Sequence, residues 1–440
     1  MCTSVLVNLD KLNRVIAVKP YKGYTDVTVQ AGMRLFELND FLSLHGLALQ
    51  NLGSISEQSV AGVISTGTHG SSAYHGLISE QIVQLKLLTR DSTLITLSDD
   101  ENPTLFRAAL LSLGKFGIIV EATIRTIPAF NLHYTQQIVD FDEFMLDWWP
   151  TFFTSAEFHR VWWYPYSRKL IVWWANRTTE PAKEPPTTFY GTRLGRVLYQ
   201  CLLWVSVVIR PSFTPAVERW LFRNQFSPKI EGVERSDKAI NMDCLFSQFV
   251  DEWSLPLLNG NECITKLDAE IQKKKFFVHA PIEIRVSNTT LPSAAQPRPE
   301  GAVVAGVPNI GPVYGNISRP YLDPSPKLPY AIPSEVGYQN LTLNLNATVY
   351  RPFGVNSPTR DWFTSFEHIC ETFGGRPHWA KNFIGKNNSP AKDHHMNGIA
   401  PQIAEWYGDD LDEWKTLRTK ADPDGLFIGN RRWLAINGLI

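Results

Sequence analysis

One stretch of the sequence decides how the rest is interpreted: it is Leu52-Gly-Ser-Ile-Ser-Glu-Gln-Ser-Val-Ala-Gly-Val-Ile-Ser-Thr-Gly-Thr-His-Gly-Ser71. Small and hydroxyl-bearing residues dominate it, so its backbone can come close to a bound ligand. Its hydroxyls and backbone N–H groups can hydrogen-bond a polar, phosphate-bearing cofactor. The stretch is neither a G-x-G-x-x-G nor a Walker loop. By composition alone, ordinary turns are the more frequent explanation of such a run.

The composition is that of a globular chain large enough for two domains. Of 440 residues, 44% are hydrophobic and 19% are charged, which excludes disorder and a coiled coil as descriptions of the whole chain. A net charge of -1 provides no overall field for nucleic acid, so no nucleic-acid partner is expected. The five cysteines lie far apart without a C-x-x-C motif. Neither a metal site nor a dense disulfide framework is therefore predicted.

The hydrophobic pattern indicates an α+β fold in two parts. Residues 5–128 alternate short β-rich runs with one helical pattern over Met33–His45, which ends at Gly46. After Pro128, closely spaced tryptophans and alternating polar positions favour a second, antiparallel sheet. Strands are predicted at Val5–Leu9, Val15–Val18, Asp26–Val29, Ile82–Thr89 and Ile118–Ile127.

The second half of the chain contains fewer clear elements. Leu291–Pro333 is rich in Pro, Gly, Ala and Ser, which is typical of a long loop or insertion. A strand is predicted over Gln339–Tyr350 and an amphipathic helix over Asp361–Phe373. The apolar run Val197–Ile209 is too short for the roughly 20 residues of a spanning helix. A buried helix is its favoured interpretation, and a segment lying on a membrane surface is the alternative.

Two pairs of polar residues are candidates for a site. Glu283 and Arg285 stand at i and i+2 in a β-rich run, so a strand would place both side chains on one face, suited to gripping a polyol. His378 and Lys381 follow Gly-Gly-Arg-Pro, which favours a loop. By spacing alone, an exposed ion pair and ordinary surface residues are the more frequent explanations of the two pairs.

Several motifs together resemble one family, the aldonolactone oxidases of the vanillyl-alcohol-oxidase-type flavoproteins. The likeness covers nearly the whole chain, in order. It is carried by the opening stretch together with Val7-Asn-Leu-Asp-Lys-Leu-Asn-Arg14, Val29-Gln-Ala-Gly32, Leu49-Gln-Asn-Leu-Gly-Ser-Ile55, Gly114-Lys-Phe-Gly-Ile-Ile119, Pro281-Ile-Glu-Ile-Arg285, His378-Trp-Ala-Lys381 and Asp422-Pro-Asp-Gly-Leu-Phe427.

The resemblance implies a two-domain flavoprotein and assigns roles to particular residues. Residues 1–130 would form a PCMH-type FAD-binding domain, and 131–440 a cap whose last segment returns to the flavin, with the insertion at 291–333. Glu283, Arg285 and Lys381 would be catalytic and, with Ser54, would bind substrate. The residues expected to contact FAD are Ser59, Gly62, Thr66, Gly67, Thr68, His69, Ile119 and His378.

The implied reaction is the FAD-dependent oxidation of an aldono-1,4-lactone at C2 by O2, which forms hydrogen peroxide. D-Arabinono-1,4-lactone is the expected substrate, because the likeness is strongest to fungal members. L-Gulono- and L-galactonolactone, and a related alditol oxidase or dehydrogenase, remain open. By resemblance, the chain would be associated with the mitochondrial outer membrane, as a peripheral partner of the lipid surface.

The sequence departs from the family pattern at its front. Members of the family begin with roughly 70 further residues that contain a Gly-x-Gly-His-Ser loop around the FAD pyrophosphate. No residue of this chain takes the role of the flavin-linked histidine of that loop, and His69 is not assigned to it. The expectation is a front-truncated enzyme that binds FAD weakly, or a non-catalytic paralogue that cannot hold FAD.

Overall fold

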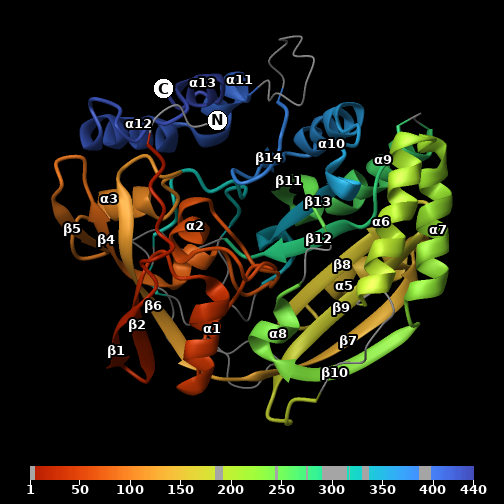
Figure 1. Cartoon of the computed structure of the whole chain (residues 1–440), viewed down its shortest axis with the longest axis horizontal. Coiled ribbons are helices and arrows are strands. Elements are labelled where there is room, and N and C mark those ends of the chain that lie inside the picture. Colours follow the sequence, from red (N-terminus) through yellow and green to blue (C-terminus); the bar gives the residue numbers. More distant parts are fainter. Residues whose placement is uncertain are drawn as a thin grey trace.

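Two antiparallel β-sheets, built from successive parts of the chain, organise the structure (Figure 1). The computed structural model describes residues 5–183, 192–242, 246–273, 276–289, 315–316, 318–329, 336–385 and 398–440. The first sheet has the order β1-β2-β6-β4-β5, with β3 beside β6. Its strands are β1 (Val15–Tyr21), β2 (Tyr24–Gln30), β3 (Leu47–Ala48), β4 (Ile82–Leu88), β5 (Leu94–Ser98) and β6 (Ile118–Pro128).

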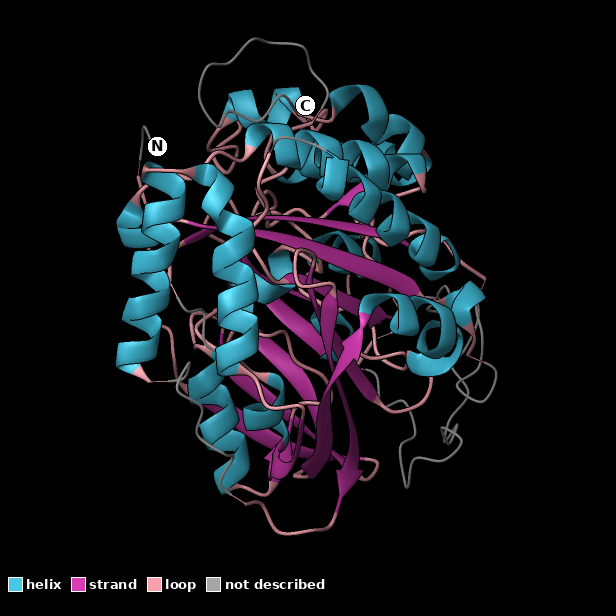
Figure 2. Cartoon of the chain, turned by 90° about the vertical axis from the view of Figure 1, so that its right-hand side faces the viewer, coloured by secondary structure: helices cyan, strands magenta, loops and turns pink. Residues whose placement is uncertain are grey.

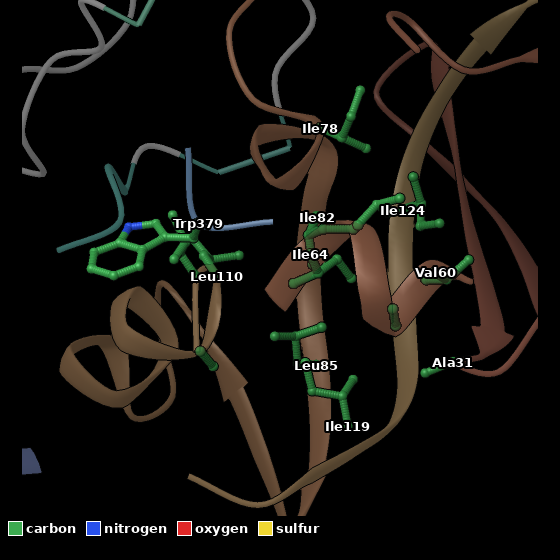
Figure 3. Close-up of a cluster of buried hydrophobic side chains, with 14 of the residues drawn as sticks. Ala31, Val60, Ile64, Ile78, Ile82, Leu85, Leu110, Ile119, Ile124 and Trp379 are labelled. Atoms are coloured by element: carbon green, nitrogen blue, oxygen red, sulfur yellow. The ribbon is translucent and has the colours of Figure 1, made fainter. Parts of the chain in front are cut away.

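Helices α1 (Leu35–Leu44), α2 (Val60–Ser65) and α3 (Pro103–Ala109) accompany the first sheet. Figure 3 shows apolar side chains of α2, β4 and β6 gathered in one cluster. The short helix α2 is formed by the middle of the 52–71 stretch, so this cluster fixes that stretch on the sheet. Burial of the apolar side of α2 is therefore what orients the polar ends of the stretch.

The second sheet is larger and has the order β10-β7-β9-β8-β12-β13-β11-β14. One of its faces packs apolar side chains against α9 (Gly260–Lys273) and α10 (Arg360–Thr372). Side chains alternate along each strand, so the opposite face carries the polar set. The strands are β7 (Asn131–Asp140), β8 (Phe158–Tyr164), β9 (Lys169–Thr178), β10 (Lys229–Arg235), β11 (Gln248–Pro256), β12 (Ile282–Ser287), β13 (Thr342–Tyr350) and β14 (Arg376–Pro377).

The remaining helices lie at the periphery. Helices α6 (Arg193–Val208) and α7 (Thr214–Gln225) stand side by side along one edge of the molecule (Figures 1 and 2). The last helices return to the first sheet, where the rings of Phe116 and Trp414 meet edge to face with their centroids 5.3 Å apart. The last helices are α11 (Ala400–Tyr407), α12 (Asp409–Ala421) and α13 (Arg431–Ile436). The short helices beside the second sheet are α4 (Phe141–Glu143), α5 (Trp149–Phe152) and α8 (Ser236–Ile240).

The end of the 52–71 stretch joins the two sheets directly. The Ser72 amide donates to the Val286 carbonyl on β12 over 2.9 Å, and the His159 amide on β8 donates to the Ser71 carbonyl over 3.1 Å. The segment therefore leaves the first layer and enters the edge of the second. This connection fixes the polar face of the larger sheet relative to the glycine-rich stretch.

Most of the predicted elements are confirmed, with two corrections. The strands and helices predicted around β1, β2, β4, β6, β13, α1 and α10 all form, and Gly46 has the left-handed φ of +68° expected after a helix. The predicted strand over Val5–Leu9 is wrong, because this segment is irregular and largely exposed. The Val197–Ile209 run forms helix α6, but the favoured buried placement is wrong, since Val197 is 51% and Ile209 is 64% exposed.

The predicted insertion at 291–333 is described only in part. Residues 315–316 and 318–329 contain no regular element, as predicted, and the rest of that range lies outside the described residues. Asn316 is buried, and its side-chain amide donates to the carbonyls of Ser79 and Ile82, both over 2.7 Å. This side chain therefore fastens the segment to the start of β4.

We expect Asn316→Ala to lower the free energy of unfolding by about 1–3 kcal/mol, because buried carbonyls of Ser79 and Ile82 lose their donor. Urea unfolding followed by tryptophan fluorescence measures this change. Asn224→Ala removes an exposed bond to the Trp220 carbonyl within α7 and is the matched control. Equal effects of the two substitutions would contradict the anchoring role of Asn316.

Candidate active site

A cavity of about 560 Å³ lies where the glycine-rich stretch meets the polar face of the second sheet. Gly53–Ile55, Thr68 and His69 line one side, and residues of β7, β8, β9, β11, β12 and β13 line the other. The loop after β14 contributes His378 and Lys381. Its volume falls in the range of small-molecule and cofactor sites.

Strand register places the polar side chains of this cavity in one row. Glu252 on β11 is opposite Asn346 on β13, which is opposite Glu283 on β12. Glu283 is in turn opposite Trp162 on β8. Residues that face one another across antiparallel strands share a face of the sheet, so the row crosses four strands and forms one wall of the cavity.

Glu252 is the centre of the site, and its side chain is fully buried. The carboxylate accepts hydrogen bonds from His69 Nε2 over 2.6 Å, Arg285 Nη2 over 3.1 Å and Asn346 Nδ2 over 3.0 Å. It also forms an ion pair with Lys381 Nζ over 2.9 Å. Burial raises the pKa of Glu252, but the charges of Lys381, Arg285 and His69 outweigh burial and hold it well below the usual range. Glu252 is therefore a fixed negative charge that gathers cations.

His378 has a structural position beside this cluster. Its Nε2 donates to the Gly67 carbonyl over 3.0 Å, and its Nδ1 accepts from the Ala380 amide over 3.1 Å. These two bonds fit a neutral ring protonated at Nε2. Burial lowers the pKa of His378 to about 3, in agreement with that tautomer. His378 thus ties the loop that carries Lys381 to the glycine-rich stretch.

Glu283 connects a further buried cation to the site. Its two carboxylate oxygens lie 3.4 Å from Arg160 Nε and 3.4 Å from Arg285 Nε. Burial lowers the pKa of Arg160 to about 10, which leaves the guanidinium charged at neutral pH, and its Nη2 donates to the Ile240 carbonyl. The charges therefore alternate across the wall from Arg160 to Lys381, and among Arg160, Glu283, Arg285, Glu252 and Lys381 the three cations exceed the two carboxylates by one.

The site also brings together three residues of types that ligate metals. One atom of His69, one of Glu252 and one of His378 lie within 4.8 Å of one another. However, Arg285 and Lys381 both contact the Glu252 carboxylate, and both ring nitrogens of His378 already have protein partners. A divalent cation would meet two positive charges here, so the donor set favours an anionic or hydroxylated ligand over a metal.

Comparison with known proteins agrees with this geometry. The family model described as D-arabinono-1,4-lactone oxidase matches residues 122–437, and an FAD binding domain model matches residues 2–98. The chain belongs to the D-arabinono-1,4-lactone oxidase family. The D-arabinono-1,4-lactone oxidase of Eremothecium gossypii is 51% identical to this lactone oxidase family member, over 99% of its length and 85% of the relative's. That of Yarrowia lipolytica is 49% identical, over 100% of this chain and 88% of its own. The Saccharomyces cerevisiae enzyme is 48% identical over 99% of this chain and 86% of its own.

Solved structures of cholesterol oxidases share the fold. A solvent-stable cholesterol oxidase is 16% identical, with a TM-score of 0.69, over 94% of this chain and 82% of its own. The cholesterol oxidase of B. sterolicum is 15% identical, with a TM-score of 0.68, over 96% of this chain and 82% of its own. At this level of identity the likeness concerns the fold, and it confirms the predicted two-domain α+β flavoprotein architecture.

The structure brings together one part of the predicted site. Ser54, Thr68, His69, Glu283, Arg285, His378 and Lys381 all line the cavity. The Ser59 hydroxyl accepts a hydrogen bond from the Gly62 amide over 3.2 Å, and the Thr66 hydroxyl donates one to the Gly62 carbonyl over 2.9 Å. Both hydroxyls are therefore used at the ends of α2. Gly67 touches the site through the His378 bond, and Ile119 is buried in the core of the first layer. All the assigned FAD contacts stay predictions, those of Thr68, His69 and His378 included.

The polar residues that sequence reasoning missed are Glu252, Arg160 and Asn346. Asn346 had a readable signal, because β13 alternates Leu343, Asn344, Leu345 and Asn346, and both faces of this strand are buried. The sequence around Glu252 gave no such signal, because an Asp-Glu pair is usually exposed to solvent. Its partners come from remote segments, so only the strand register and the loop after β14 reveal its role.

The residues around the cavity fit an FAD flavin together with a polyol substrate. Glycines in the 52–71 stretch keep its backbone tightly folded: a Cβ on Gly53 would lie 2.9 Å from Thr68 Cγ2, and one on Gly70 would lie 2.0 Å from Asn51 Oδ1. Arg160 Nε and Arg285 Nε are enclosed and each lies 3.4 Å from an oxygen of Glu283, so these groups are paired with one another. The excess positive charge of this wall suits an electron-rich ligand.

The buried histidines predict how stability depends on pH. Burial lowers the pKa of His159, His279 and His378 to about 3, 4 and 3, so all three fold in the neutral form. The unfolded chain takes up protons below about pH 6.5, and each such histidine then costs about 1.4 kcal/mol of stability per pH unit. We expect His378→Gln to reduce the slope of unfolding free energy against pH, between about pH 6 and 5, by close to one proton.

Urea unfolding at several pH values measures the slope. His368→Gln, on the exposed side of α10, is the matched control and should leave the slope as in the wild-type chain. A slope that is the same in the wild-type chain and in His378→Gln would contradict the neutral, enclosed state of His378.

Proposed function

We propose that this chain binds FAD and oxidises D-arabinono-1,4-lactone at C2 with O2, which yields dehydro-D-arabinono-1,4-lactone and hydrogen peroxide. The observation that supports this most directly is the wall of alternating charges from Arg160 to Lys381, which faces a cavity of substrate size. It occurs in a chain that is about half identical to lactone oxidases over nearly its whole length.

We assign the binding of the lactone hydroxyls to Glu283, Arg285 and Lys381. Glu283 lines the cavity and its side chain is 13% exposed, so its carboxylate can accept a hydroxyl hydrogen bond. Arg285 is 5% exposed, and the Glu252 carboxylate holds its guanidinium in one orientation. Ser54 Oγ lies 3.4 Å from Arg285 Nη1, so this hydroxyl completes the binding wall from the glycine-rich side.

The chemistry requires a hydride acceptor and charge stabilisation. When bound, FAD supplies the hydride acceptor and passes the electrons to O2. The chain's own cations, Arg285 and Lys381, stabilise negative charge as the C2 hydroxyl loses its proton. Glu252 is not the proton acceptor in this proposal, because its oxygens already have three hydrogen-bond donors and the Lys381 ammonium as partners, and its pKa is held well below the usual range.

The absorbance spectrum of the purified, FAD-reconstituted chain tests this function. We expect a flavin band near about 450 nm that bleaches on anaerobic addition of D-arabinono-1,4-lactone and returns with air, with one peroxide formed per lactone. Glu283→Gln and Arg285→Lys should slow the bleaching by about 10²–10³-fold, since they remove interactions with developing charge. L-Gulono- and L-galactonolactone serve as comparison substrates. A flavin-loaded chain that D-arabinono-1,4-lactone does not bleach would contradict the proposal.

We further propose that helices α6 and α7 rest on the surface of a mitochondrial membrane, the location that the family resemblance implies. Among the described helices, none is long and apolar enough to cross a membrane. Leu194, Val197, Val208 and Ile209 nevertheless expose apolar side chains on α6 and directly after it. Arg193 and Arg210 lie at the two ends of this patch, which supports contact with anionic headgroups.

Vesicle sedimentation tests the membrane proposal. We expect the chain to bind anionic vesicles more tightly than neutral ones, and Val197→Asp combined with Ile209→Asp to weaken binding by about tenfold. Leu426→Asp alters an equally exposed leucine near the C-terminus and should bind as the unaltered chain does. Unchanged binding of the double variant would exclude α6 as the contact.

A further inference from the structure

A second pair of carboxyl groups lies directly behind the active-site wall. Asp251 precedes Glu252 on β11, and successive strand residues point to opposite faces. The side chain of Asp251 therefore points away from the cavity, toward Glu367 on α10. Asp251 is fully buried and Glu367 is 6% exposed, so neither carboxyl is solvated to a useful extent.

Glu367 fastens the end of the segment that carries Lys381. Its two oxygens accept hydrogen bonds from the amides of Ile384 and Gly385, the second over 2.8 Å. The start of the same segment is held by the His378 amide, which donates to the Glu252 carbonyl over 2.9 Å. Residues 378–385 thus follow the edge of β11 from its active-site face to the face of Asp251.

The middle of the segment is held as well. The Asn382 amide donates to the Val250 carbonyl over 2.7 Å, and the Val250 amide donates to Asn382 Oδ1 over 3.0 Å. Lys381 lies between these anchors and Glu252. Its ammonium group can reach the Glu252 carboxylate only while the segment keeps this course along the strand.

The carboxyl pair must hold a proton. Neither oxygen of Asp251 has a hydrogen bond of ordinary geometry in the described part of the chain. The other groups that act most strongly on the pair are Trp253, Glu371, Cys370 and the backbone of Glu252, none of which is a cation. His368 lines the same cavity as Glu367, but its side chain is exposed. Two adjacent buried carboxylates without a counter-charge would repel strongly, so one of them is protonated.

The hydrogen bonds identify which carboxyl carries the proton. Glu367 accepts hydrogen bonds from two backbone N–H groups and is therefore the ionised partner, whereas Asp251 has no hydrogen bond of ordinary geometry in the described part of the chain and is the neutral one. Burial, followed by the negative charge of Glu367, raises the pKa of Asp251 well above its usual range. The neutral Asp251 can offer its proton to Glu367 and steady the carboxylate that holds the segment.

We propose that Asp251 and Glu367 share one proton and together act as a positioning element for Lys381. The role of Lys381 rests on the proposed function. At alkaline pH the pair loses its proton, and the repulsion between the two carboxylates displaces Glu367 from the amides of Ile384 and Gly385. The segment then loosens, and Lys381 loses its fixed orientation toward Glu252.

Hydrogen–deuterium exchange at the amides of residues 382–385 tests the pair without reference to activity. After correction for intrinsic pH dependence, we expect protection in the wild-type chain to fall by about tenfold between neutral and alkaline pH. Asp251→Asn is permanently neutral and similar in shape, so its protection should stay constant. Asp361→Asn makes the same change on the exposed side of α10 and should behave as the wild-type chain does. A decline in Asp251→Asn equal to that of the wild-type chain overturns the proposal.

Two further measurements complete the test. Glu367→Gln should increase exchange at Ile384 and Gly385 at every pH, and unchanged exchange would overturn the proposal even if Asp251→Asn did not fold. In the flavin-loaded enzyme, the KM for the lactone should rise at alkaline pH in the wild-type chain and stay constant in Asp251→Asn. The exchange pattern without lactone oxidation would support the pair and reject the proposed function, so the two failures are distinguishable.

Discussion

A single buried charge, the carboxylate of Glu252, constrains the arrangement of the whole site. A fully buried carboxylate is stable only where cations and donors compensate for its lost hydration. Here His69, Arg285, Lys381 and Asn346 supply that compensation, and they come from four separate parts of the chain. Satisfying one charge therefore aligns the glycine-rich stretch, two strands of the larger sheet and the loop after β14.

This constraint explains why the site lies at the junction of the two layers. The glycine-rich stretch is fixed on the first sheet by the apolar side of α2, and its end enters the second sheet at Ser72. The second sheet packs its apolar face against α9 and α10, which leaves the polar face for the cavity. His69 and His378 then connect the two sides through Glu252 and Gly67. Arg285 and Lys381 are thereby held in place before any ligand enters, so that little reorganisation is needed for them to stabilise a negative charge.

The sequence predicted those parts of the site that depend on local spacing. The i and i+2 positions of Glu283 and Arg285 place them on one strand face, and the structure adds that this face is enclosed and not solvated. The turn chemistry at Gly46 likewise located the end of α1. Glu252 and Arg160 were not predictable in this way, because their importance comes from pairing across strands and from contacts distant in the sequence. The exposure of α6 was also missed, since an apolar run of its length does not reveal which of its faces is covered.

The coupling between Glu252 and Lys381 tests the central claim most directly. Unfolding free energies of the wild-type chain, Glu252→Gln, Lys381→Met and the double variant give this coupling. Because Lys381→Met removes one of the cations that compensate the fully buried Glu252 carboxylate, the account predicts that the two single losses exceed the loss of the double variant by about 1 kcal/mol or more. Losses that add to within about 0.5 kcal/mol would show that the two charges are independent, and would contradict the role of Glu252 as the organising charge.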